Sequence, residues 1–229
     1  MPAISRSALV SLGLVAGTLT LAVAANAAGL LVDGGACGSL DNPFGPFDYR
    51  RISGTDLQLI ETHHFTAAVE SLEHGHEGPI GGDLSYTLRA IPNHPRALLA
   101  MSRLALREHG AQPYGAGYSV ECWFDRAIAF APDDPMVRVL YANYLVAAGK
   151  PDRALMQLGF VHGAGPDDAN LQYNLGLAYF RLKEYARAVE HARRAYALGF
   201  PLPGLRELLV SVGKWKESRS AAPTNHVDK

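Results

Sequence analysis

Two pairs of histidines lie close together in the chain, at His63-His64 and at His74 and His76. Imidazole is a common ligand of zinc and copper, so such pairs could bind a metal ion. Adjacent residues of a helix point to different faces, however, and no cysteine pair lies nearby to complete a site. We therefore expect no metal ligands and no cofactor. A metal-binding or metal-delivery protein that uses this cluster is an alternative function.

The chain lacks the sequence signatures of several common catalytic sites. It contains no G-x-S-x-G, no P-loop, no H-E-x-x-H and no dinucleotide-binding fingerprint. Glu61, Glu70 and Glu73 are more simply the solvated face of a helix than an acid–base pair. The sequence thus favours a protein that is not an enzyme. A small envelope enzyme with its site in the N-terminal region is a second alternative.

Cys37 and Cys122 are the two cysteines of the chain, so they allow a single intramolecular pairing. In an oxidising compartment we expect them to form a disulfide. Such a bond would stabilise the fold by roughly 4–5 kcal/mol in the chain-entropy model, because the loop between them is long. Two buried free thiols, or a reactive cysteine, are the alternatives.

The first 27 residues have the organisation of a secretory signal peptide. Arg6 is followed by the uncharged run 7–25, and then by the small-residue triplet Ala25-Asn26-Ala27. We expect cleavage after Ala27, with an uncleaved membrane anchor as the alternative. No other apolar stretch approaches the length of a membrane span. The sequence therefore predicts a periplasmic or secreted protein with no membrane span after cleavage.

The composition is that of an ordinary globular protein. Of 229 residues, 48% are hydrophobic and 19% are charged, which excludes a disordered or collagen-like chain. The formal net charge is −1, so bulk electrostatics would not attract nucleic acid. We therefore expect no nucleic-acid partner.

A sequence period of 34 residues runs through the second half of the chain. Pro132-Asp133-Asp134 is repeated at 166–168, and Ala154 is matched by Ala188. The copy at 169–202 also carries Asn174-Leu175-Gly176 and Ala178-Tyr179-Phe180 at the expected offsets. This pattern resembles the tetratricopeptide repeat (TPR), a helix–turn–helix unit of 34 residues. The resemblance implies an all-α, TPR-type helix–turn–helix solenoid, in which neighbouring repeats bury each other's apolar faces.

The repeats give the expected division of the chain. Residues 37–51 have aromatic side chains but no helical period, and Pro43 and Pro46 forbid a regular helix there. We expect a non-regular arm that packs on the helices, or one that covers part of the binding groove. The segments are a signal peptide (1–27), an extended arm (28–54), a degenerate leading repeat (55–94), three repeats (95–134, 135–168 and 169–202), a capping helix (203–217) and a disordered tail (218–229).

Several local features follow from the residue types. Asp134 and Asp168 precede apolar helical segments and should act as N-caps. Gly176 and Ala188 are small where two antiparallel helices must approach closely. In the flanks, the apolar spacing predicts one helix over 57–72, another over 83–91 and a closing helix over 203–216.

The resemblance also implies a binding surface, because the first helix of each repeat lines the concave face. Asn143 and Asn174 occupy positions that some TPR proteins use to hold a C-terminal carboxylate, although Val139 stands where that clamp has a lysine. Some of these residues could instead pack against a neighbouring helix or the arm. The expected partner-binding residues are Arg96, Arg103, Asn143, Asn170, Tyr173, Asn174, Leu177 and Arg181. The expected function is scaffolding or assembly of an envelope complex, by binding an extended peptide or helix in this groove.

Overall fold

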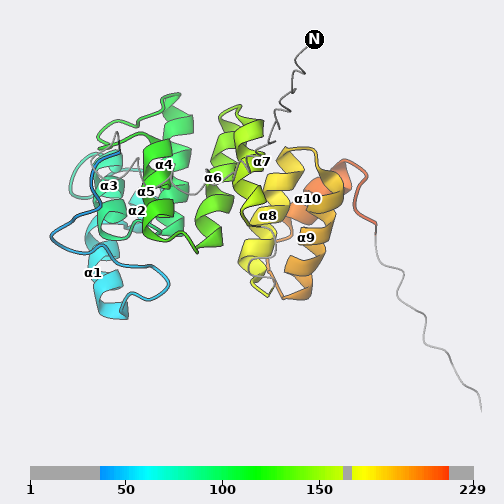
Figure 1. Cartoon of the computed structure of the whole chain (residues 1–229), viewed down its shortest axis with the longest axis horizontal. Helices are drawn as coiled ribbons and strands as arrows, with labels where there is room; N and C mark the ends of the chain where they lie inside the picture. The colour runs from blue at the N-terminus through cyan, green and yellow to red at the C-terminus, as the bar shows by residue number, and fades with distance from the viewer. Residues whose placement is uncertain (1–36, 162–166, 217–229) are drawn as a thin grey trace, which may run out of the picture.

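The computed structural model describes residues 37–161 and 167–216, which fold into ten helices with no strand among them (Figure 1). The all-α prediction is confirmed for these residues. The signal peptide, residues 28–36 of the arm and the C-terminal tail lie outside the described residues. The helices are α1 Gly54–His64, α2 Ala67–Ser71, α3 Ile80–Ala90, α4 Pro95–Glu108, α5 Val120–Phe130, α6 Pro135–Ala147, α7 Pro151–Gly159, α8 Ala169–Arg181, α9 Tyr185–Ala197 and α10 Gly204–Ser211.

Helices α4, α6 and α8 begin at side chains that cap their first turn. The carboxylates of Asp134 and Asp168 accept backbone N–H groups of α6 and α8, as predicted. His94 has the same role for α4, because its Nδ1 accepts the N–H of Ala97 at 3.1 Å. Pro95 and Pro135 follow their caps in the first turn, where no N–H donor is needed.

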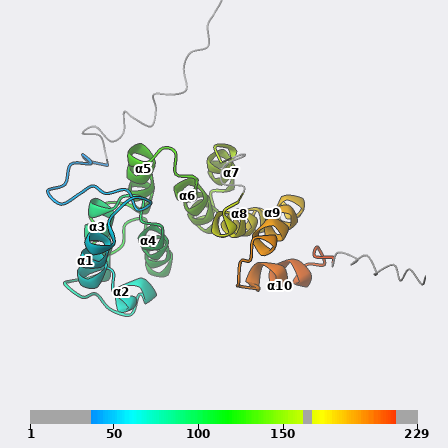
Figure 2. The same cartoon turned by 90° about the horizontal axis from the view of Figure 1, so that it is seen from below.

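The helices pack mainly on neighbours in the chain. Helix α6 contacts α4 on one side and α8 on the other, while α7 packs on α6 and α9 packs on α8. Helix α10 packs on α8 and α9. Figure 2 shows the resulting row of helices as bent, with α4 and α10 on the same side of α6 and α8. One apolar core runs from α2 to α8, and a second joins α8, α9 and α10.

The predicted close approach at Gly176 is present. A Cβ atom added to Gly176 would lie 2.4 Å from Cδ2 of Leu205 and 3.4 Å from the carbonyl oxygen of Ala188. Both of these neighbours are fully buried. Glycine is therefore needed for Leu205 of α10 to pack as it does against α8, whereas α9 approaches at a tight but tolerable distance.

Two helix predictions in the flanks are wrong in their extent. The segment 57–72 is not one helix, because α1 ends at His64, with Phe65 as its C-cap, and Thr66 caps a second helix, α2. Phe65 is buried, and the break lets its ring reach the core instead of following the face of α1. The closing helix ends at Ser211, before the left-handed Gly213, which turns the chain so that Trp215 packs against Tyr196.

The arm is joined covalently to α5. Cys37 and Cys122 form the predicted disulfide, with an S–S distance of 2.09 Å. One turn further along α5, the buried Arg126 donates from Nη1 to the carbonyl oxygens of Cys37, Gly38 and Ser39. The first described residues of the arm are thus held by a covalent bond and by a charged donor.

The rest of the arm packs on two of the loops that connect the helices. The N–H of Phe47 donates to the carbonyl of Ala90 at 2.8 Å. The side chain of Asn93 accepts the N–H of Tyr49 and donates to the carboxylates of Asp48 and Asp134. The side-chain amide of Asn93 thus links the arm to the α3–α4 loop and to the α5–α6 loop. Figure 2 shows the arm beside α1, α3 and α5 and away from α10.

Candidate functional site

The predicted binding residues of α4 have different surroundings. Arg96 donates to the carboxylates of Glu70 and Glu61, and its guanidinium lies over the ring of Phe65. The hydrogen bonds from Arg96 lower the pKa of Glu70. The charge of Arg96 is therefore already balanced inside the protein.

Arg103 lies two turns further along α4 and is exposed. It has no ion pair within the described parts of the chain. Leu99 and Leu106 are 44% and 37% exposed, and their spacing places them on the same side of the helix as Arg103. This side of α4 therefore presents apolar surface around a positive charge.

The structure brings Asn143, Asn174 and Arg181 together between α6 and α8. Asn143 is buried; its Nδ2 donates to the carbonyls of Val139 and Asn174, and its Oδ1 accepts from Arg181 at 2.8 Å. Asn174 in turn donates to Asn170. The amide of Asn143 is thus occupied, whereas the exposed Arg181 has no carboxylate partner among the described residues.

Tyr173 and Leu177 contact the C-terminal part of the chain. The ring of Tyr173 stacks on Phe200 with centroids 4.0 Å apart. Both Tyr173 and Leu177 pack against the cluster that contains Leu205 of α10. At this end of α8 the predicted surface is therefore largely covered by the segment that follows α9.

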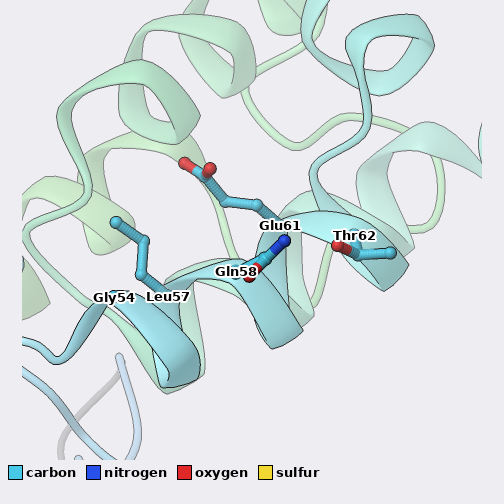
Figure 3. A pocket seen from close by; sticks show the side chains of 5 residues that line it. All are labelled: Gly54, Leu57, Gln58, Glu61 and Thr62. Atoms are coloured by element: carbon cyan, nitrogen blue, oxygen red, sulfur yellow. The ribbon is translucent and has the colours of Figure 1, made fainter.

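A depression of about 470 Å³ lies along one face of α1, where the side chains of Leu57, Gln58, Glu61 and Thr62 project (Figure 3). Oε1 of Glu61 accepts from Nε2 of His94 at 3.1 Å. The backbone donor at Nδ1 of His94 forces its proton onto Nε2, so neither ring nitrogen is free to take up a proton. Burial lowers the pKa of His94 to about 4. This carboxylate–imidazole pair is therefore structural.

The histidine pairs lie where α1 meets α3 and the loop before α3. The carboxylate of Asp83 is almost fully buried; one oxygen lies 3.1 Å from Nδ1 of His64 and the other accepts the N–H of His76 at 2.7 Å. His63 and His76 both approach the carboxylate of Glu77. Asp83 thus fixes both the loop and the ring of His64.

His64 also lines a cavity of about 320 Å³. The ring of His64 stacks on Tyr86 of α3, with centroids 3.7 Å apart. The arm contributes Phe44 to the lining, and α1 contributes Leu59, Ile60 and His63 as well as His64. Most of this lining is apolar, and the imidazoles are its main polar groups.

His64 contacts Asp83 and His63 approaches Glu77, and both rings line the cavity. His74 is exposed, and its Nδ1 contacts the carbonyl of Gly75. In the part of the chain that the structure describes, no three His, Cys, Asp or Glu side chains are arranged to hold a metal ion.

Sequence reasoning missed Asp83 and Tyr86. Asp83 does carry a signal, since it is a lone carboxylate on the apolar face of α3 beside Leu84, Thr87 and Leu88. A buried acid on such a face requires hydrogen-bond donors from elsewhere in the fold. Tyr86 lies on the exposed side of α3 and carries no comparable signal.

No helix within residues 37–161 and 167–216 has the length and apolar character needed to cross a membrane. No family model, curated protein or solved structure to which the chain was compared matches it.

Proposed function

We propose that this chain is an exported TPR protein and that its helix pairs form a solenoid. It binds a protein partner, as an extended peptide or a helix, on the face formed by α4, α6 and α8, and so scaffolds or assembles an envelope complex. The supporting observation is the series of these three helices. They begin at residues 95, 135 and 169, each after a capping side chain, and each contacts the next.

The chemistry of this face favours an acidic partner segment with apolar side chains. Arg103 is exposed between Leu99 and Leu106, and Arg181 is exposed near Asn174. Neither arginine has an ion pair within the described residues, so a partner carboxylate would gain a cation without breaking an internal pair. Guanidinium groups bind carboxylates strongly because they donate two parallel hydrogen bonds. The exposed leucines supply the apolar contact that a charged groove alone lacks.

A C-terminal carboxylate would meet Arg181 first. The amide of Asn143 already donates to two backbone carbonyls and accepts from Arg181. It can reach a ligand only if these bonds are exchanged. The proposed contact is therefore made chiefly by arginine, with Asn143 holding Arg181 in position.

The disulfide supports export, because such bonds persist in oxidising compartments. The predicted cleavage after Ala27 can be tested by measuring the intact mass of protein recovered from the host envelope or medium. A protein that begins at Ala28 is the expected result. An unprocessed chain in the cytosol would contradict the proposal.

An arrayed library of short acidic peptides would test the binding face. The peptides should contain leucine but no aromatic residue, and each should be paired with a copy in which lysine replaces the acidic residues. We expect binding of the acidic set, at least about tenfold weaker in Arg103→Glu and weakened also in Leu99→Ser. Arg51→Glu is the matched control, because Arg51 is 78% exposed on the arm. Equal binding by Arg103→Glu and Arg51→Glu would refute the assignment of this face.

A further inference from the structure

The cavity between the arm, α1 and α3 has the size and lining of a small ligand site. Its volume of about 320 Å³ is at the lower end of the range for such sites and suits one substituted ring. Phe44, Leu59 and Ile60 supply apolar walls. Tyr86 and His64, stacked on each other, supply an aromatic one. A flat apolar ring is the shape that these walls accommodate.

His64, which lines the cavity, offers a hydrogen-bond acceptor, because its ring is held by Asp83. The carboxylate of Asp83 can only accept, and its other oxygen already takes backbone N–H groups of His76 and Glu77. Nδ1 of His64, 3.1 Å away, is therefore the protonated nitrogen. In the neutral imidazole Nε2 then carries a lone pair, and no donor to it is found among the described residues. A ligand that reaches Nε2 gains a hydrogen bond by offering an O–H or N–H.

The charges around the cavity select against acids. The six lining residues include no lysine or arginine, while Asp83 and Glu77 lie directly behind His64 and His63. A carboxylate ligand would face these two acidic side chains without a permanent cation to offset them. The ligand that fits is thus a neutral ring with a donor.

We propose that this cavity binds a phenol ring, with the ring between Phe44 and the His64–Tyr86 stack and the hydroxyl donating to Nε2 of His64. The ring could belong to a free phenolic compound or to a tyrosine side chain of a peptide. The site is separate from the face of α4, α6 and α8, and it does not depend on the function proposed for that face.

Calorimetric or ligand-observed NMR titrations of the purified chain would test this site. The probes are p-cresol for the free phenol and N-acetyl-tyrosinamide for the side chain. The comparison compounds are 4-methylanisole, which has no donor, and benzoate, which is charged. We expect p-cresol to bind in the millimolar range or tighter, and 4-methylanisole roughly tenfold more weakly, because one hydrogen bond is lost. Benzoate should bind more weakly than p-cresol.

Variants locate the binding. His64→Phe keeps an aromatic ring but removes Nε2, so the preference for p-cresol over 4-methylanisole should fall from about tenfold to near unity. That ratio does not depend on the amount of folded protein. Leu59→Glu should abolish binding, and Gln58→Glu, the adjacent exposed residue of α1, is its matched control.

The results distinguish a free phenol from a tyrosine side chain as the ligand, and three of them would overturn the proposal. Tight binding of p-cresol alone would assign the site to free phenols, and equal binding of N-acetyl-tyrosinamide would assign it to tyrosine. No binding of either probe at about 20 mM would overturn the proposal, since fragment-sized ligands in true sites bind below that level. An unchanged preference in His64→Phe, or equal binding by Leu59→Glu and Gln58→Glu, would also overturn it.

Discussion

Protonation of His94 should govern the acid stability of this protein. The imidazole is fully buried between the rings of Tyr49 and Phe65, and both of its nitrogens are hydrogen-bonded. Burial is the largest cause of its lowered pKa, about 4 in the folded protein against an ordinary 6.5, and the carboxylate of Glu61 opposes the shift only in part. A proton would also displace the backbone N–H of Ala97 from Nδ1.

The expected effect follows from proton linkage. Above pH 6.5 the ring is neutral in both states and has no effect. Between pH 6.5 and about 4 the unfolded chain takes up a proton that the folded protein does not, so the free energy of unfolding falls by about 1.4 kcal/mol per pH unit. Between pH 6.5 and about 4 the free energy of unfolding thus falls by roughly 3 kcal/mol in total. Below pH 4 the folded protein is also protonated and this contribution to the pH dependence ends.

The assay is urea denaturation of the wild type and of His94→Asn at several pH values from 7.5 to 4.5, at constant ionic strength. Asparagine retains an N-cap acceptor but does not titrate. His94→Asn should be the less stable protein at pH 7.5, and the difference should shrink by about 2–3 kcal/mol on going to pH 4.5.

The control is His109→Asn at the other end of α4. His109 is exposed and adopts a left-handed conformation that asparagine tolerates. The difference in the free energy of unfolding between His109→Asn and the wild type should change with pH much less than the difference for His94→Asn. A difference for His94→Asn that stays constant within about 0.5 kcal/mol across this range would refute the reasoning.

Three further variants, one of them with a control, test the packing by urea denaturation at pH 7.5. Replacing Cys37 and Cys122 by serine should lower the free energy of unfolding by up to about 4–5 kcal/mol, because an 85-residue separation is no longer bridged. Gly176→Val should cost about 1–3 kcal/mol by overpacking α8 against α10, whereas Gly159→Ala, with open space around it, should cost little. Asn93→Ala should cost about 1–3 kcal/mol and speed amide exchange in the arm, since it removes the acceptor that holds Tyr49.

Features set by short-range chemistry were predictable from the sequence. Asp134 and Asp168 cap their helices because an acceptor next to an apolar helical run has its donors within three residues. Gly176 was identifiable because a small residue inside a helical period indicates close packing. The disulfide could be predicted because two cysteines allow a single pairing, and the signal-like N-terminus favours an oxidising compartment.

Features that depend on distant contacts were not predictable. Nothing in the apolar spacing of 57–72 shows that Phe65 leaves the helix to reach the core. The His64–Asp83 contact joins residues 19 positions apart, and Phe44 reaches their cavity from the arm. Likewise, the repeat spacing places Tyr173 on one face of α8 but does not reveal that Phe200 stacks on it.

The disulfide also has a mechanical consequence. Tension applied to the two ends of the chain passes from Cys37 directly to Cys122 through the S–S bond. Helices α1–α4, which lie between these cysteines, are then shielded from the load, and unfolding under force would extend only α6–α10 and the end of α5. The segment between the two cysteines, with its 85-residue separation, has an extended contour length of about 300 Å. A pulling experiment would release this length only after the disulfide is reduced.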